Sequence, residues 1–221
     1  MITGTLPDGS KGFDANTTVR PEDAAAFLAA GYTFAVRYIR RVQAHSYDLS
    51  VQERDDILGA GLGLMVVQHV ALDGWVPTPE LGTQYGETAV TALGELGIPA
   101  EVCVWLDLEG VKGGTPHGDV IGFCNNWFDV VKAVGYMPGL YVGYGAGLTA
   151  DELYRKLKFT AYWSAYNLDA PNFPAVRGVQ MRQGVAHASD LIPGFTNQTL
   201  DVNVIRADAL GGTPVLLFGG L

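Results

Sequence analysis

The stretch that decides the fold is Glu101-Val-Cys-Val-Trp-Leu-Asp-Leu-Glu109, which has the composition of a buried β-strand and ends in two acidic residues. Side chains along a strand alternate between its two faces. One face carries only aliphatic residues, which suits burial beneath a helical layer: Val102, Val104, Leu106 and Leu108. The other face carries Cys103, Trp105, Asp107 and Glu109. The stretch therefore predicts a core strand that delivers two carboxylates to one place.

Seven more short apolar runs give eight candidate strands, at residues 11–15, 33–39, 63–68, 101–108, 139–143, 159–165, 178–183 and 199–205. A helical pattern follows each of the first five. Two of these helices begin with the capping-box sequences Ser50-Val-Gln-Glu53 and Thr149-Ala-Asp-Glu152. The others are expected from Pro21 to Gly31, over 79–96 and over 119–134.

The alternation of strands and helices predicts an α/β fold with a parallel sheet and right-handed crossovers. Eight strands in this length favour a single TIM-like barrel. The last helices are expected to be short or missing, because residues 167–174 and 184–197 have no apolar helical period. An open doubly wound sheet is the alternative, although no G-x-G-x-x-G motif follows the first strand to support it.

Composition indicates one well-packed domain over residues 1–221, with a core at about 10–208 and an apolar tail at 211–221. The net charge of −9 argues against a nucleic-acid partner and against anionic membrane surfaces. No stretch is apolar for long enough to cross a bilayer. Two cysteines, Cys103 and Cys124, are expected to be buried free thiols.

Four acidic residues are expected at the barrel mouth, because the C-terminal ends of strands carry the active sites of such barrels. Asp14 ends the first strand, Asp107 and Glu109 end the fourth, and Asp201 lies in the eighth. Crowded carboxylates do not ionise together, so one can donate a proton while another stays charged. Glycoside hydrolysis uses such a pair. The alternative is that these acids solvate strand ends or pair with Arg37, Arg40 or Arg182.

Aromatic and amide side chains near the mouth are candidate sugar contacts. The aromatic candidates are Trp163, Tyr144 and Tyr166, with Tyr141 and Tyr162 near them; the polar ones are Gln68, His69, Gln180, Gln183 and Arg37. Core packing is the alternative for most of the aromatic residues, and loop capping is the alternative for His69.

Several of these stretches resemble a known family in the same order along the chain. They are Gly12-Phe-Asp14, Phe34-Ala-Val-Arg-Tyr38, Val104-Trp-Leu-Asp-Leu-Glu109, Leu140-Tyr-Val-Gly143, Tyr162-Trp-Ser-Ala165 and Leu200-Asp-Val-Asn203. Over residues 10–208 the sequence resembles the glycoside-hydrolase-like barrel domain of actinobacteria and their phages, which is related to the family 25 lysozymes.

That resemblance implies a (β/α)5β3 barrel that cleaves the N-acetylmuramyl–N-acetylglucosamine linkage of peptidoglycan. It implies Glu109 as general acid/base, Asp107 as the group that stabilises the transition state or assists the acetamido group, and Asp14 and Asp201 as supporting carboxylates. One departure is Ala15-Asn16 after Asp14, where the lysozymes usually have a serine two residues on.

The leading expectation is a hydrolase of peptidoglycan, of the kind that serves as an endolysin or virion component of a bacteriophage, with no cofactor and no metal. Residues 1–14 lack the pattern of a secretion signal, so the chain is expected to stay in the cytoplasm until lysis or to travel with a virion. The alternatives are a non-catalytic glycan-binding or structural module, with the apolar tail at 214–221 docked on a partner protein, and a metal-dependent hydrolase that uses the four acids as ligands.

Overall fold

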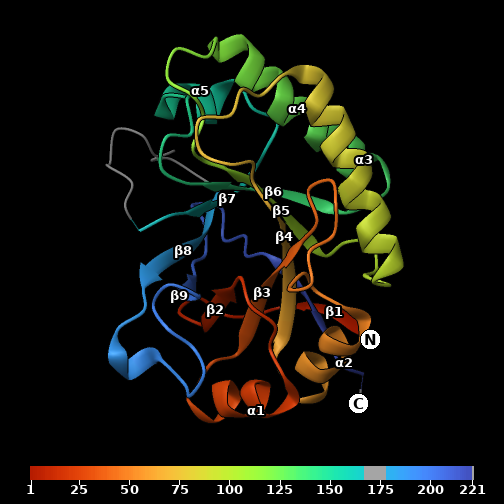
Figure 1. Cartoon of the computed structure of the whole chain (residues 1–221), viewed down its shortest axis with the longest axis vertical. Coiled ribbons are helices and arrows are strands. Elements are labelled where there is room, and N and C mark those ends of the chain that lie inside the picture. Colours follow the sequence, from red (N-terminus) through yellow and green to blue (C-terminus); the bar gives the residue numbers. More distant parts are fainter. Residues whose placement is uncertain (167–177, 221) are drawn as a thin grey trace.

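The computed structural model describes residues 1–166 and 178–220, and these residues form a closed barrel of eight strands with helices outside it (Figure 1). The barrel strands are β2 (Lys11–Ala15), β3 (Phe34–Ile39), β4 (Gly63–Gln68), β5 (Cys103–Leu108), β6 (Met137–Val142), β7 (Ala161–Ser164), β8 (Val179–Val185) and β9 (Leu200–Ile205). They pair in the order β4-β3-β2-β9-β8-β7-β6-β5, and a β4–β5 pairing closes the ring. The predicted TIM-like barrel is therefore confirmed.

Five α-helices lie in the described residues, and each follows one of the first five barrel strands. They are α1 (Pro21–Ala29), α2 (Val51–Gly59), α3 (Pro79–Glu95), α4 (His117–Ala133) and α5 (Ala150–Arg155). Figure 1 shows α3, α4 and α5 on one side of the strands and α1 and α2 on the other. Between β8 and β9 there is only the short 3-10 helix η2 (Ala188–Asp190). The predicted segment at 167–174 lies outside the described residues.

The last barrel strand corrects the expectation of a wholly parallel sheet. β9 is antiparallel to both of its neighbours, β2 and β8. The connection between β8 and β9 contains no helix that could return the chain to the start of the barrel, so β9 begins at the mouth and runs away from it. Asp201, near the start of β9, therefore lies at the same end of the barrel as the ends of the parallel strands.

The helix starts follow the sequence in one case and depart from it in the other. Thr149 and Glu152 form the predicted capping box. The Ser50 side chain accepts a hydrogen bond from the backbone N–H of Glu53, but the Glu53 carboxylate does not return to Ser50. It binds the Arg37 side chain and the Val19 N–H instead. The buried Arg37 side chain therefore takes the place of the Ser50 N–H as the partner of the Glu53 carboxylate.

Two hydrophobic layers hold the barrel together. The outer layer lies between strands and helices, where Phe13, Phe27 and Tyr32 pack ring against ring. The inner layer fills the barrel itself and includes Phe34, Val36, Met65, Trp105, Trp163 and Leu216. Cys103 belongs to the inner layer and Cys124 to the outer one, and both are buried free thiols as predicted. The packed interior forms a rigid base for the side chains at the mouth of the barrel.

The apolar tail, for which the sequence favours attachment to a partner protein, is part of the fold. β10 (Val215–Phe218) pairs with β1 (Ile2–Thr5) and, at Leu217, with the start of β4. Leu216 and Leu217 are fully buried. The ribbon of β1 and β10 closes the end of the barrel opposite the mouth, because Leu216 joins the inner layer there. Its apolar residues already have a partner within the chain.

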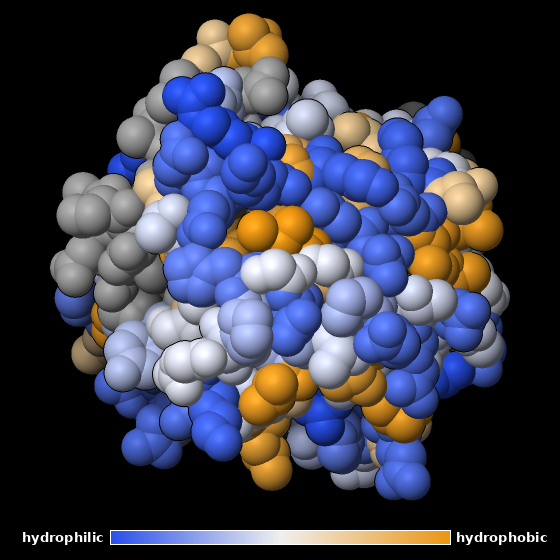
Figure 2. Space-filling view, turned by 90° about the horizontal axis from the view of Figure 1, so that it is seen from above, coloured by the Kyte–Doolittle hydropathy of each residue, from blue (hydrophilic) through white to orange (hydrophobic). Residues whose placement is uncertain are grey.

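No helix in residues 1–166 and 178–220 is long and apolar enough to span a membrane. On the face shown in Figure 2, hydrophobic residues form separate patches divided by hydrophilic ones. Two leucines are nevertheless almost fully exposed, Leu72 at 87% and Leu210 at 80%.

Candidate active site

Four carboxylates meet at the mouth, and we refer to Asp14, Asp107, Glu109 and Asp201 as the acid cluster. Asp14 on β2 and Asp201 on β9 are direct partners across the antiparallel pair. The negative charges of Glu109 and Asp14 act on Asp107, and those of Asp14 and Glu109 act on Asp201. The closed barrel thus brings together four acids that lie far apart in the sequence. Among the described residues, none of the four forms an ion pair.

Asp14 is held by hydrogen bonds from three side chains. Its Oδ2 accepts from Asn203 Nδ2 at 2.8 Å and from Gln183 Nε2 at 3.0 Å, and its Oδ1 accepts from the Tyr38 hydroxyl at 3.3 Å. Burial raises the pKa of Asp14 above its ordinary value, and these hydrogen bonds partly oppose that shift. The carboxylate is fixed in one orientation.

A second set of hydrogen bonds orients the amides that hold Asp14. Trp163 donates its indole N–H to Asn203 Oδ1 at 2.9 Å, and the Tyr141 hydroxyl donates to Gln183 Oε1 at 3.0 Å. Because each amide oxygen accepts one of these hydrogen bonds, each amide NH₂ group faces Asp14. The floor of the mouth is therefore preorganised.

Asp107 and Glu109 are the acids most altered by their surroundings. Burial, then the charge of Glu109, raises the pKa of Asp107 well above its ordinary value. Burial, followed by the charges of Asp14 and Asp73, raises the pKa of Glu109. Asp107 is only 5% exposed, and its Oδ1 has no hydrogen-bond partner among the described residues. A buried oxygen without a hydrogen bond disfavours the folded state.

Asp201 completes the titrating group. Burial, together with the charges of Asp14 and Glu109, raises the pKa of Asp201 to about 7. Near neutral pH the cluster therefore retains protons that free carboxyl groups would have lost. It contains both proton donors and proton acceptors, as acid/base chemistry requires.

The position of Glu109 depends on the absence of a side chain at Gly143, at the end of β6. A Cβ atom added there would lie 2.2 Å from Glu109 Oε2 and 2.6 Å from Glu109 Cβ. The backbone of Glu109 is also fixed, because its carbonyl accepts a hydrogen bond from the Trp75 indole at 2.8 Å. Gly143 thus provides the space in which the Glu109 carboxylate stands.

Of the predicted aromatic contacts, two are accessible at the mouth and one is not. Tyr144 is 67% exposed after β6, and Tyr166 is 53% exposed after β7. Trp163 is fully buried in the inner layer, where it packs against Trp105 and Tyr141. Its predicted contact with a sugar is therefore corrected to a supporting role beneath Asn203. Tyr162 faces outward and donates its hydroxyl to the Leu153 carbonyl.

Three predicted polar contacts lie away from the mouth. Arg37 alternates with Val36 and Tyr38, so it points outward, where it is fully buried and binds Glu53 at 2.6 Å. Gln68 is buried between the barrel and its helices, where it accepts from the Trp127 indole and donates to the Tyr85 carbonyl. Gln180 is buried and donates to Asp208. The strand alternation that places Gln183 at Asp14 turns Gln180 to the other face.

His69 does lie at the mouth, beside the acid cluster. Its Nε2 is 2.8 Å from Asp48 Oδ1, and its ring stacks on Tyr38, the same residue that donates to Asp14. Burial lowers the pKa of His69 below its ordinary value. The predicted loop-capping role and a ligand-binding role are both compatible with this position.

Several site residues were not singled out from the sequence. Tyr38 shares the inward face of β3 with Phe34 and Val36, so strand alternation could have identified it. Asp73 acts on Glu109 from the loop after β4, and a loop residue of this kind leaves no periodic signal. No group of three or more His, Cys, Asp or Glu side chains in residues 1–166 and 178–220 is arranged to hold a metal ion.

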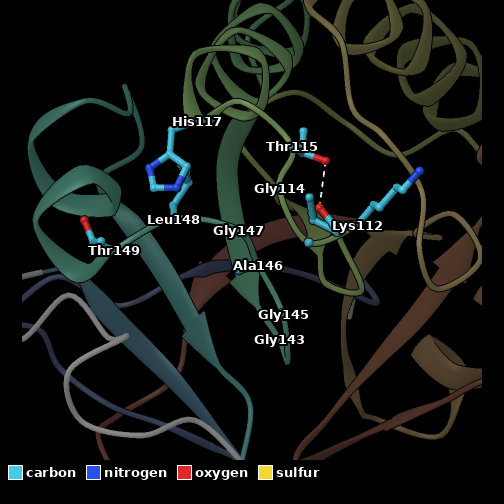
Figure 3. A pocket seen from close by; sticks show the side chains of 12 residues that line it. Lys112, Gly114, Thr115, His117, Gly143, Gly145, Ala146, Gly147, Leu148 and Thr149 are labelled. Atoms are coloured by element: carbon cyan, nitrogen blue, oxygen red, sulfur yellow. Dashed lines mark hydrogen bonds between the residues drawn. The ribbon is translucent and has the colours of Figure 1, made fainter.

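Two hollows flank the acid cluster on the rim of the mouth. One, of about 410 Å³, lies between loops 111–115 and 143–149 and is walled largely by glycine backbone (Figure 3). Thr115 and His117 stand on opposite sides of it in that view, and Thr115 donates to the Lys112 carbonyl at 2.7 Å. The other, of about 610 Å³, lies between loops 41–47 and 69–73. The first hollow is lined by Gly143, which lies against Glu109, and the second by His69, which stacks on Tyr38, so both adjoin residues of the acid cluster.

Solved structures of the same fold include proteins from three bacteria. The Tat-secreted protein Rv2525c of Mycobacterium tuberculosis, in complex with L-tartrate, superposes with a TM-score of 0.63 at 16% identity, covering 90% of this chain and 96% of that one. The bacterial lysozyme from Streptomyces coelicolor gives 0.56 at 14% identity, covering 93% and 95%. A family 25 glycosyl hydrolase from Bacillus anthracis gives 0.57 at 13% identity, covering 90% and 89%.

No curated protein matches the sequence. A family description does match it, namely "Rv2525c-like, glycoside hydrolase-like domain", over residues 25–193. This match spans most of the barrel, from α1 into the connection between β8 and β9. The chain belongs to the Rv2525c-like glycoside hydrolase-like family, whose fold is shared with the family 25 lysozymes.

Proposed function

We propose that the chain is a glycoside hydrolase that acts on bacterial peptidoglycan as a muramidase. The single observation that carries the proposal is the acid cluster: four carboxylates with raised pKa values meet at the mouth without a cation paired to any of them in the described residues. Such a cluster opposes folding, because like charges and burial both disfavour the ionised forms. A catalytic role would explain why the protein keeps a cluster that opposes folding, and a lysozyme has the same fold.

Glu109 is the proposed general acid/base. It is the member of the Asp107–Glu109 pair that is partly exposed, so it can reach the oxygen of a glycosidic bond. Its raised pKa extends the pH range in which Glu109 keeps a proton for the leaving oxygen. After the bond breaks, the ionised Glu109 can accept a proton from the attacking water.

Asp107 is the proposed partner for the acetamido group or for the positive charge that develops in the transition state. Its buried Oδ1 lacks a partner among the described residues, so its hydrogen-bonding capacity is not used within the protein. Asp14 and Asp201 are the proposed supporting carboxylates: the charge of Asp14 helps to keep Glu109 and Asp107 protonated, and Asp201 lies opposite Asp14 across the sheet. Tyr144 and Tyr166 are the proposed sugar contacts at the mouth. Gln68, Arg37, Gln180 and Trp163 are not included, because their side chains are buried in the contacts described above.

The test is the release of reducing ends from purified cell walls. We expect the wild-type chain to release them and Glu109→Gln to lose more than about 100-fold of the rate, because general acid catalysis contributes about that much. Glu87→Gln, on the exposed face of α3, is the matched control and should retain the wild-type rate. An inactive wild-type chain, or a fully active Glu109→Gln chain, would refute the proposal.

A second candidate function is a non-catalytic glycan-binding module. The burial of Asp14 and Asp107 favours it, because these acids contribute little accessible surface. This candidate expects saturable binding of wall fragments without cleavage, and equal binding by Glu109→Gln. In either case the place of action is the cell wall, reached after secretion or after lysis; the related protein of Mycobacterium tuberculosis is a secreted one.

A further inference from the structure

The larger rim hollow, formed by loops 41–47 and 69–73, differs from its neighbour in the chemistry of its walls. It contains an aromatic pair, His45 and Tyr47, whose rings are parallel at a centroid distance of 5.0 Å. The edge of the His69 ring packs against both, at 5.7 and 5.8 Å. The hollow in Figure 3 has no aromatic side chain in its walls except His117. Of the two hollows, the larger therefore has the more aromatic walls.

The walls of the same hollow carry both apolar and polar groups, and a sugar can contact both kinds. Leu72 projects from its wall at 87% exposure, and Val42 is also exposed. Arg41, Gln43 and Asp73 supply hydrogen-bonding groups. Arg41 donates to the Val70 carbonyl through Nη1, while its buried Nε has no partner among the described residues. A pyranose ring presents C–H groups on its faces and hydroxyl groups around its edge, so it can satisfy both kinds of wall.

Two contacts join this hollow to the acid cluster. His69 stacks on Tyr38 at 4.7 Å, and Tyr38 donates to Asp14. On the other side, Asp73 approaches Gly110, next to Glu109, and its charge acts on Glu109. The volume of about 610 Å³ lies within the range of about 300–1,000 Å³ that is usual for small-ligand sites. A polymer bound at the acids can therefore continue into the hollow.

We infer that the hollow between loops 41–47 and 69–73 is a distal subsite that binds a sugar unit of the polymer beyond the one at the acid cluster. Tyr47 and Leu72 contact the ring face, and Arg41 and Gln43 bind its hydroxyl groups. The inference rests on the proposed function in one respect, namely that both sites bind the same glycan. It adds that the protein selects long chains over short ones.

The experiment measures affinity without turnover, by titration calorimetry with the Glu109→Gln chain. The probes are a peptidoglycan tetrasaccharide of alternating N-acetylglucosamine and N-acetylmuramic acid, and the corresponding disaccharide. We expect the tetrasaccharide to bind more tightly, and Tyr47→Ala and Leu72→Ser to raise its Kd about fivefold to tenfold, in keeping with the loss of one aromatic or aliphatic contact. The Kd of the disaccharide should change less than about twofold.

Leu210→Ser is the matched control, because Leu210 is exposed to a similar degree and lies beyond the end of β9, away from the mouth. It should leave both Kd values unchanged. Thermal unfolding should show that all variants are folded, since Leu72 is exposed and the Tyr47 carbonyl that accepts from Arg37 remains in the alanine variant.

The outcomes separate the inference from the proposed function. Equal affinity for the two saccharides, or a Leu72→Ser chain that binds the tetrasaccharide as tightly as its parent, would overturn the subsite. A wild-type chain that binds the tetrasaccharide through Leu72 without releasing reducing ends would overturn the hydrolase and leave the subsite in place. Binding of neither saccharide would overturn both.

Discussion

Gly143→Ala should lower the rate about 100-fold although it removes no carboxylate. The added Cβ would lie 2.2 Å from Glu109 Oε2, where ordinary contacts begin at 3.4 Å. It would also lie 2.6 Å from Glu109 Cβ and 2.9 Å from Tyr141 Cε1. Rotating the carboxylate relieves only the first of these contacts, so Glu109 must move as a whole by about 1 Å, a displacement that can cost a catalytic group about 100-fold in rate.

The assay pairs the initial rate of reducing-end release with thermal unfolding. Overpacking between β5 and β6 should also lower the free energy of unfolding by about 1–3 kcal/mol. Gly94→Ala is the control, because a Cβ at this position in α3 meets open space; it should keep the full rate and stabilise the helix by about 0.5–1 kcal/mol. A Gly143→Ala chain with the wild-type rate would refute the idea that the position of Glu109 limits catalysis.

Three further predictions concern stability. The folded chain retains a proton on Asp201 up to about pH 7, whereas the unfolded chain loses it near the ordinary pKa of 3.8. The stability that this proton contributes is therefore complete below about pH 4 and is lost as the pH rises through 7. Asp201→Asn should reduce the fall in Tm between pH 4 and pH 8, and an unchanged pH profile of Tm would contradict the shift. Glu53→Gln leaves the buried Arg37 without its counter-charge and should cost about 3–5 kcal/mol in urea denaturation, with exposed Glu22→Gln as a neutral control. Leu216→Ala should cost about 2–5 kcal/mol in the same assay, and a loss below 1 kcal/mol would show that the tail is dispensable.

The sequence was sufficient for the barrel and for the residues that strand alternation controls. The period of two along 101–109 places Cys103, Trp105, Asp107 and Glu109 on one face, and all four side chains line the barrel interior or its mouth. The same rule placed Asp201 and Asn203 inward, and they face Asp14. Local pattern is informative here because burial on both faces leaves a strand little freedom of register.

Other positions depend on partners that no local pattern reveals. The sequence offers Arg37 as a substrate contact, yet Arg37 pairs with Glu53 in the next element, α2, and the capping-box pattern predicts Ser50 as the partner of that same carboxylate. β9 is antiparallel because the connection before it has no helix to return the chain to the start of the barrel. β10 forms because it pairs with β1 at the other end of the chain. Such features require knowledge of the whole assembly of strands.

The ribbon of β1 and β10 has a practical consequence for anyone who handles this protein. Met1 and Gly220 lie side by side, and both leave the barrel at the end that Leu216 plugs. An affinity tag, a bead or a second protein fused at either terminus would therefore hang beneath the barrel. The mouth would remain free to approach a broad insoluble sheet without obstruction from the attachment.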